Sequence, residues 1–288
     1  MAITNTKIAF IGGGNMAQAI LTGLLMAKFQ PKNILVCAPT ATTRETLTSK
    51  FGLNVSENNS AAVVFAEIIF IAVKPNIVST VATELNVAMT HAAKQPLIIN
   101  LAAGVTTEQL QTHFESNQRV IAAMPNLPSA VCKGLTGLVA AKNCDQLSIT
   151  LADDVLTCIG KTLWLDDESK MPAVVAIAGS APAYFFLFLE AMIESGQKLG
   201  LTYQQAEAAA MQSGIGALTM ASTSALSVVE LKEQVTSPNG TTHQALASFA
   251  DNNLKAVVDD AMQAAAKKAA NLCGLPLVNN KKILKQRN

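Results

Sequence analysis

The stretch IAFIGGGNMA, residues 8–17, decides the fold of this protein. It joins a short apolar run to a G-x-G-x-x-A pattern formed by Gly12, Gly14 and Ala17. A glycine turn that follows a strand and opens a helix is typical of dinucleotide-binding units. Gly12 permits the tight turn, Gly14 lets a pyrophosphate approach the backbone, and Ala17 allows close packing of helix on strand. The free N–H groups at the helix start favour an anion, so we expect a dinucleotide site here; the alternative is a purely structural turn.

Short apolar runs continue outward from this turn and alternate with helix-like runs. Runs that are apolar throughout and separated by helices indicate a parallel sheet covered on both faces. The expected strands are residues 7–11, 34–37, 68–73, 97–101, 120–123, 135–141 and 162–165, and the expected helices are residues 17–29, 42–51 and 146–159.

The pattern changes after Asp166, where Ala, Gln, Met and Leu dominate. Thr202 and Gln205 have the spacing of a capping box, which predicts a helix to about residue 219. Apolar residues at helical spacing predict an amphipathic helix over 254–265. We therefore expect an α/β Rossmann-like dinucleotide-binding domain at 1–166 and an all-α dimerisation and substrate domain at 167–288.

Residues 171–189 carry no charge and approach the length of a membrane span. Pro172, Gly179 and Pro182 interrupt the stretch, however. We expect a loop, a helix start at 180–182 and a helix buried on most sides, and no membrane insertion.

The composition narrows the class of protein. Half of the 288 residues are hydrophobic and only 14% are charged, which favours a surface partly covered by another subunit. The formal net charge of +1, without a strong basic patch, argues against nucleic-acid binding. The five cysteines form no C-x-x-C pair, so neither a metal site nor a disulfide framework is indicated. With no signal-peptide pattern at the start, we expect a cytoplasmic protein with reduced thiols.

The residues after the second expected strand favour NADPH. NAD-binding folds commonly place an acidic residue there for the ribose, but the first acidic residue of this chain is Glu45. The hydroxyl-rich loop at 38–43 precedes Arg44, a combination that suits a 2′-phosphate. NADH stays possible, and Arg44 has the alternative of an ordinary surface arginine.

Two further loops follow parallel strands, where ligands of such sheets bind. They read AVKP at 72–75 and AAGV at 102–105. Pro75 sets the first turn, and the small alanines leave room for a flat cofactor. Lys74 could approach a phosphate or ribose, with a solvent-exposed lysine as the alternative.

Six segments in order resemble the pyrroline-5-carboxylate reductase family: FIGGGNMAQAI (10–20), FIAVKPN (70–76), INLAAGVT (99–106), AAMPNLPSAV (122–131), GSAPAYFFLFLEAM (179–192) and VTSPNGTT (235–242). The resemblance spans both halves, and the pair GSxPAY and TSPxGTT is its most specific part. It implies a hydride transfer from a reduced nicotinamide to C5 of L-1-pyrroline-5-carboxylate, giving L-proline in the last step of proline biosynthesis. It also implies a domain-swapped homodimer and, by further assembly, a ring of dimers such as a homodecamer.

The resemblance places the site residues as well. Thr242 is implied as the catalytic partner of the ring nitrogen. The implied substrate contacts are Ser237, Gly240, Thr241 and Thr242. With the glycine turn included, the expected cofactor contacts are Gly12, Gly14, Asn15, Met16, Ala38, Asn59, Ala72, Val73, Lys74, Pro75, Ala102 and Ala103.

The stretch TSPNGTTH, residues 236–243, contains no acid, lysine or arginine. A protonated imine accepts hydride without a strong base, and a helix N-terminus with hydroxyls can bind a carboxylate. We expect no catalytic role for His243, which follows Thr242 directly. The alternative for Thr242 is a threonine that serves only the helix start.

The chain departs from the family pattern at a few positions. It has Ala181 and Asn239 where the family usually has glycine, Ser227-Val228 in place of a His-Pro pair, and Ala225 near a common glutamate. Asn239 tolerates a left-handed backbone nearly as well as glycine. Two alternatives stay open: a reductase of another cyclic imine or a β-hydroxy acid, and a non-catalytic dinucleotide-binding protein. The β-hydroxy-acid reading would need a catalytic lysine that residues 171–189 lack.

Overall fold

The computed structural model of the protein describes residues 3–93, 95–114 and 118–277. They divide into two compact units, Met1–Ser180 with Ala265–Asn288, and Ala181–Ala264. The first unit is α/β and the second is all-helical, as expected from the sequence. The assignment of separate roles to residues 1–166 and 167–288 stays a prediction.

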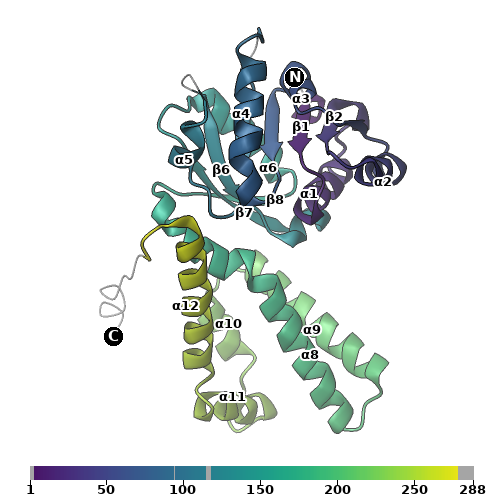
Figure 1. Ribbon diagram of the computed structural model, residues 1–288. Helices are drawn as coiled ribbons and strands as arrows, with labels where there is room; N and C mark the ends of the chain where they lie inside the picture. Colours follow the sequence, from purple (N-terminus) through teal and green to yellow (C-terminus); the bar gives the residue numbers. More distant parts are fainter. Residues whose placement is uncertain (1–2, 94, 115–117, 278–288) are drawn as a thin grey trace. The chain divides into compact units, whose positions relative to one another are not determined.

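The first unit is built on an eight-stranded sheet in the order β3-β2-β1-β4-β5-β6-β7-β8 (Figure 1). Neighbouring strands are parallel except for β6 and β7, which are antiparallel. The parallel sheet was predicted, whereas the antiparallel pair and the short, half-exposed β3 were not. The strands are β1 Ile8–Ile11, β2 Ile34–Cys37, β3 Asn54–Ser56, β4 Ile68–Ile71, β5 Leu97–Asn100, β6 Val120–Met124, β7 Gly134–Ala140 and β8 Gly160–Trp164.

The connections of the first unit are mostly helical. The α-helices are α1 Asn15–Met26, α2 Ala41–Phe51, α3 Ser60–Phe65, α4 Val78–Met89, α5 Thr107–Gln111, α6 Gln146–Thr157 and α7 Met171–Val174. Short 3₁₀ helices lie at Ile3–Asn5, Pro31–Asn33, Pro75–Ile77, Leu127–Val131 and Glu168–Lys170, and a π-helix spans Val175–Gly179. The loop predicted over 171–179 was therefore wrong: Pro172 lies in the first turn of α7, where proline is tolerated.

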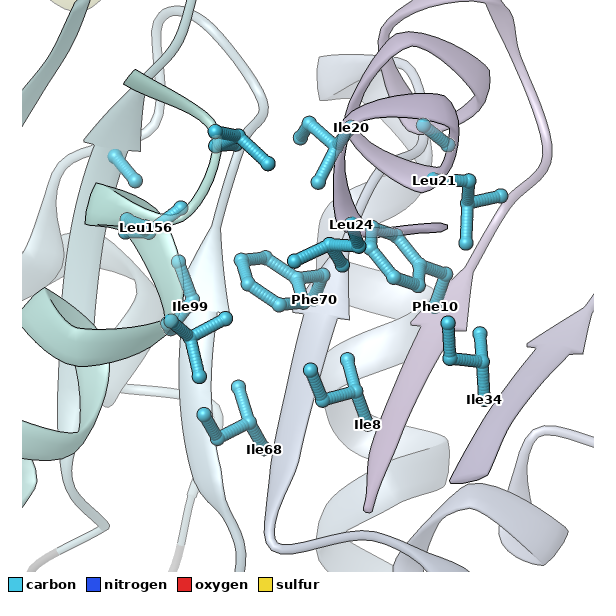
Figure 2. Packing of buried hydrophobic residues seen from close by; sticks show 14 of the residues in the cluster. Ile8, Phe10, Ile20, Leu21, Leu24, Ile34, Ile68, Phe70, Ile99 and Leu156 are labelled. Carbon is cyan, nitrogen blue, oxygen red and sulfur yellow. The ribbon is translucent and has the colours of Figure 1, made fainter. Parts of the chain in front are cut away.

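Hydrophobic layers fill both faces of the sheet. On one face, side chains of α1 and α6 pack against the strands (Figure 2). Phe10 and Phe70 stack there with ring centroids 4.7 Å apart, and Leu24 and Leu156 are fully buried. On the other face, α3, α4 and α5 cover a second apolar layer that includes Leu85 and Leu110. Coverage of both faces explains why the strands read as continuous apolar runs.

Helix α1 approaches the 3₁₀ helix Leu127–Val131 very closely at Gly23. A Cβ atom at this position would lie 2.2 Å from the carbonyl oxygen of Ser129 and 2.8 Å from the Ile159 side chain. Backbone cannot give way as a flexible side chain does, so this crossing requires a residue without a side chain.

The second unit consists of α8 Ala181–Lys198, α9 Tyr203–Thr223, α10 Val228–Gln234, α11 Thr241–Asp251 and the first part of α12 Leu254–Cys273. The predicted capping box is present: the Thr202 hydroxyl accepts from the Gln205 N–H, and the Gln205 side chain accepts from the Thr202 N–H. Ser227 and Glu230 form a second one at α10, where the family pattern has a His-Pro pair.

Helix α8 exposes a large apolar surface. Phe185, Phe186 and Leu187 are each more than half exposed, and no residue of α8 is buried. The prediction of a helix buried on most sides is wrong for a single chain, because the described residues leave these three side chains more than half exposed. The helical stretch Glu168–Lys198 is also long and apolar enough to cross a membrane, although it contains Pro172 and Pro182.

Candidate functional site

The predicted cofactor loops begin at one edge of the sheet. The strand register pairs Ile11 with Cys37 on one side and with Ile71 on the other, and Ile71 in turn with Asn100. These four residues are the last of β1, β2, β4 and β5. Because parallel strands end on the same side, the four following loops share the carboxyl edge of the sheet, where such folds bind ligands.

The glycine turn has the geometry expected for close backbone approach. Gly12 has φ of 102°, and its N–H donates to the Cys37 carbonyl oxygen over 2.8 Å. A Cβ atom on Gly12 would lie 2.5 Å from the carbonyl oxygen of Ala72, so the turn touches the loop after β4. A Cβ atom on Gly14 would meet nothing within 4 Å, which leaves its outer face open. The two glycines therefore have different roles: Gly12 allows close packing against the loop after β4, and Gly14 leaves the space next to it open.

The start of α1 presents backbone N–H groups that have no partner in the part of the chain that the structure describes. Asn15 and Met16 are its first residues, Gly14 is its N-cap without a side-chain cap, and Gln18 makes the first N–H to Gly14 carbonyl bond. The Gln18 side chain donates to the Gly13 carbonyl oxygen over 3.0 Å and holds the turn from behind. This arrangement fits the pyrophosphate of a dinucleotide, because the N–H groups and the helix dipole both favour an anion.

Arg44 has a structural role that the sequence did not reveal. Its Nη1 donates to the carbonyl oxygens of Ala38 and Pro39, each over 2.8 Å, and its Nη2 lies 3.3 Å from Glu57. The guanidinium therefore fixes the loop after β2. Its predicted partner, a 2′-phosphate, would have to share the side chain with these contacts.

The loop after β4 is exposed at its tip. Ala72 and Val73 are half-buried, whereas Lys74 and Pro75 are exposed.

Asn59, the N-cap residue of α3, donates from its side chain to Glu84 over 2.7 Å, so its amide group is already engaged. The predicted cofactor contacts of these residues stay predictions.

The β5–α5 loop, which we define as residues 101–106, carries Ala102 and Ala103. Asn100 was missed from the sequence, although it is a buried polar residue at the end of an apolar strand. Its side-chain oxygen accepts from the Ala102 N–H over 3.0 Å, and its amide donates to the Val105 carbonyl oxygen over 3.0 Å. Asn100 thereby shapes the loop from inside, which leaves Ala103 exposed.

Ionisable groups around this edge are few. Burial raises the pKa of the Cys37 thiol to about 11, so it stays protonated and inert. Glu168 is half-buried, and desolvation raises the pKa of its carboxyl group while bonds from Thr107 oppose that rise. No group of three His, Cys, Asp or Glu suited to a metal occurs among the described residues.

The stretch TSPNGTT lies in the second unit, at the start of α11. Asn239 has φ of 62°, the left-handed conformation anticipated for it, and the Gly240 N–H donates to the Ser237 carbonyl oxygen over 3.0 Å. Gly240 is the N-cap, so Thr241 and Thr242 are the first two helical residues. Within the described part of the chain, neither of their hydroxyl groups forms a hydrogen bond. The turn thus offers free N–H groups and free hydroxyls together, which is the composition of a neutral anion cradle.

Comparison with known proteins agrees with both halves. The family described as pyrroline-5-carboxylate reductase dimerisation matches residues 168–272, and the family described as NADP oxidoreductase, coenzyme F420-dependent, matches residues 7–104. A pyrroline-5-carboxylate reductase of Pseudomonas aeruginosa is 36% identical over 94% of this chain and 98% of its own. That of Haemophilus influenzae is 40% identical over 89% of this chain and 94% of its own.

Solved structures agree as well. A pyrroline-5-carboxylate reductase from Coxiella burnetii has a TM-score of 0.85 and 35% identity, covering 93% of this chain and 98% of its own. A pyrroline carboxylate reductase from Plasmodium falciparum with NADP bound has a TM-score of 0.82 and 27% identity, covering 94% and 99%. Several relatives are more than 30% identical to this chain and align with both of its halves, which establishes the family. The chain belongs to the pyrroline-5-carboxylate reductase family.

Proposed function

We propose that this enzyme reduces L-1-pyrroline-5-carboxylate to L-proline with a nicotinamide dinucleotide. The proposal rests on one observation: the same chain contains an open glycine turn at the start of α1 and an uncharged TSPNGTT turn at the start of α11. The first suits a pyrophosphate, and the second suits a carboxylate beside a cationic imine. When bound, the reduced nicotinamide supplies the hydride that adds to C5 of the imine.

The protein's own contribution is placement and hydrogen bonding. The N–H groups at the start of α11, with Ser237 and Gly240, bind the substrate carboxylate. The Thr242 hydroxyl pairs with the ring nitrogen, which keeps its proton while the C=N bond becomes a C–N bond. No strong base is needed, since the protonated imine already carries its own proton. Hydride addition to C5 cancels its positive charge and gives a neutral secondary amine, which then takes up one proton from water.

The cofactor is NADPH in this proposal. The segment 38–44, directly after β2, contains no acidic residue where a ribose-binding carboxylate would lie, and Arg44 stands in the first turn of α2. The Plasmodium falciparum neighbour has NADP bound, which supports the same assignment. The pyrophosphate lies at Gly14, Asn15 and Met16, and the other predicted cofactor contacts line the remaining loops of the carboxyl edge.

We assign the exposed apolar side chains of α8 and α9 to self-association. The dimerisation family covers this region, and Phe186, Ile215 and Leu218 are each more than half exposed in a single chain. The dimer proposed is domain-swapped and assembles further into a ring of dimers. We place the enzyme in the cytoplasm, in keeping with five free cysteines.

The test is a steady-state assay with the imine and each reduced cofactor. The wild type should oxidise NADPH only when the imine is present and should form proline. NADPH oxidation that does not respond to the imine would overturn the proposal. A β-hydroxy acid that supports NADP reduction instead would favour the alternative reductase.

The cofactor preference is tested with Arg44→Ala and its control Lys50→Ala, which removes an exposed cation from the same helix. We expect the KM for NADPH to rise at least about tenfold more than the KM for NADH, as for one charge-assisted hydrogen bond. Equal rises for both cofactors would assign Arg44 to loop support alone and leave the NADPH preference unsupported.

A further inference from the structure

The β5–α5 loop is held at its end by a residue that lies far away in the sequence. The Glu168 carboxylate accepts the Thr107 N–H on both oxygens, over 3.2 Å and 3.1 Å, and accepts the Thr107 hydroxyl over 2.9 Å. Thr107 is buried and is the first residue of α5, directly after the loop. Its two donors need acceptors, and a carboxylate offers only acceptors, so the pair is matched in chemistry.

The opposite side of the same loop rests on the end of α12. Gly104 has φ of 86°, and a Cβ atom there would lie 2.7 Å from the Leu272 carbonyl oxygen. Asn100 supports the loop from within, as described above. Among the described residues, Asn100, the end of α12 and Glu168 therefore bound the loop that carries Ala102 and Ala103, and of these Glu168 alone contributes a charge.

Glu168 does not form a ligand site of its own. The cavity that it lines with Asn100, Met171 and Cys273 has a volume of about 20 Å³, which is room for about one water and too small for a cofactor fragment. Among the described residues, no cation lies within 4.0 Å of its carboxylate, and Asp167 and Glu108 add negative charge nearby. A half-buried carboxylate without a cation is costly, and among the described residues all the hydrogen bonds that Glu168 accepts come from Thr107.

We propose that Glu168 is a positioning residue that sets the conformation of the β5–α5 loop through Thr107 and thereby the affinity for NADPH. The inference rests on the proposed function, since it takes Ala102 and Ala103 as cofactor contacts. Loss of the carboxylate removes the acceptor of both Thr107 donors, leaves the Thr106–Gln109 capping box as the remaining support of this helix start, and lets the loop move away from the shape that accepts the cofactor. The substrate carboxylate, which is bound by other residues, is not affected.

The experiment measures the dissociation constant of NADPH by fluorescence titration of the full-length protein. Glu168→Ala and Thr107→Val should each weaken binding about tenfold, the effect of one hydrogen bond to a charged group. Glu108→Ala, the matched control, removes an exposed carboxylate from the same turn without touching Thr107, and should leave binding unchanged. Glu168→Gln keeps one acceptor and should restore part of the affinity.

Two readouts separate positioning from general stability. The KM for NADPH should rise in Glu168→Ala while the KM for the imine stays constant. The double variant Glu168→Ala/Thr107→Val should bind NADPH no more weakly than Glu168→Ala, because the two residues act through one contact. If Glu168→Ala does not fold, Thr107→Val and Glu168→Gln decide the question, since both nearly keep the original shape.

The inference is overturned if Glu168→Ala and Glu108→Ala bind NADPH alike, or if the double variant shows additive losses. These outcomes differ from failure of the proposed function, because NADPH binding is measured without the imine. If the wild type binds NADPH but does not reduce the imine, the proposed function is wrong. The NADPH titration of the Glu168 and Thr107 variants then still decides the inference. A wild type that binds neither NADPH nor NADH overturns both.

Discussion

At the scale of single residues, Thr242 shows how little chemistry this reaction asks of the protein. Its hydroxyl has no hydrogen-bonding partner among the described residues, and Gly240 rather than a threonine forms the N-cap of α11. A hydroxyl that the helix start does not use is available for a ligand. The absence of acid, lysine and arginine from TSPNGTT fits a substrate that brings one charge of each sign.

Replacing Thr242 by alanine should reduce kcat by about 10²-fold, comparable to the loss of one placed hydrogen-bonding group in an active site. NADPH affinity should stay the same, because the hydroxyl serves the imine. Thr242→Ser should keep most of the activity. The matched control is Thr236→Ala, whose hydroxyl donates to the Lys232 carbonyl oxygen inside α10. Wild-type kinetics in Thr242→Ala would remove this residue from the mechanism.

At the scale of elements, the crossing of α1 over the 3₁₀ helix Leu127–Val131 links the glycine turn to the rest of the sheet. Gly23 makes the close approach possible, since a Cβ atom would lie 2.2 Å from the Ser129 carbonyl oxygen. A shift of α1 would also move its N-terminus, which is the proposed anion site.

Gly23→Ala should therefore destabilise the protein by about 1–3 kcal/mol through overpacking, although alanine is the better helix former. Denaturant unfolding would measure the change in the free energy of unfolding. Thr22→Ala is the control, since it places the same residue at the neighbouring position of the same helix and should change stability by less than about 1 kcal/mol. A neutral or stabilising Gly23→Ala would mean that the two elements can separate at little cost.

At the scale of the whole molecule, self-association explains the composition. Only 14% of the residues are charged, and the described residues leave large apolar side chains of α8, such as Phe185, Phe186 and Leu187, more than half exposed. Exposed apolar surface of this extent marks an interface, and the family match over residues 168–272 identifies the partner as a second copy of the chain.

Phe186→Arg should yield a species with the 30.2 kDa mass of one chain, because the charge would be buried without a partner in the assembly. Light scattering after size-exclusion chromatography measures this mass. Leu147→Arg makes the same change at a residue of the first unit that is 80% exposed, and should leave the assembly intact. An unchanged mass in Phe186→Arg would place the interface elsewhere.

The amino-acid sequence determined the class of fold and the local geometry of both turns. Continuous apolar runs predicted the parallel strands, because each must be covered on two faces. Gly12 predicted a tight turn, which it forms with a φ of 102°, and Asn239 was expected to tolerate a left-handed backbone, which it adopts with a φ of 62°. These features depend on the preferences of consecutive residues, which a single sequence displays.

Only the tertiary structure decided the contacts between distant parts of the chain. The antiparallel pairing of β6 with β7, the engagement of Arg44 with the Ala38 and Pro39 carbonyl groups, and the bond from Thr107 to Glu168 had no sequence signal. Thr107 and Glu168 are 61 positions apart, and nothing in their neighbours specifies that they meet. Such contacts follow from the simultaneous packing of all elements around the core, which no local preference encodes.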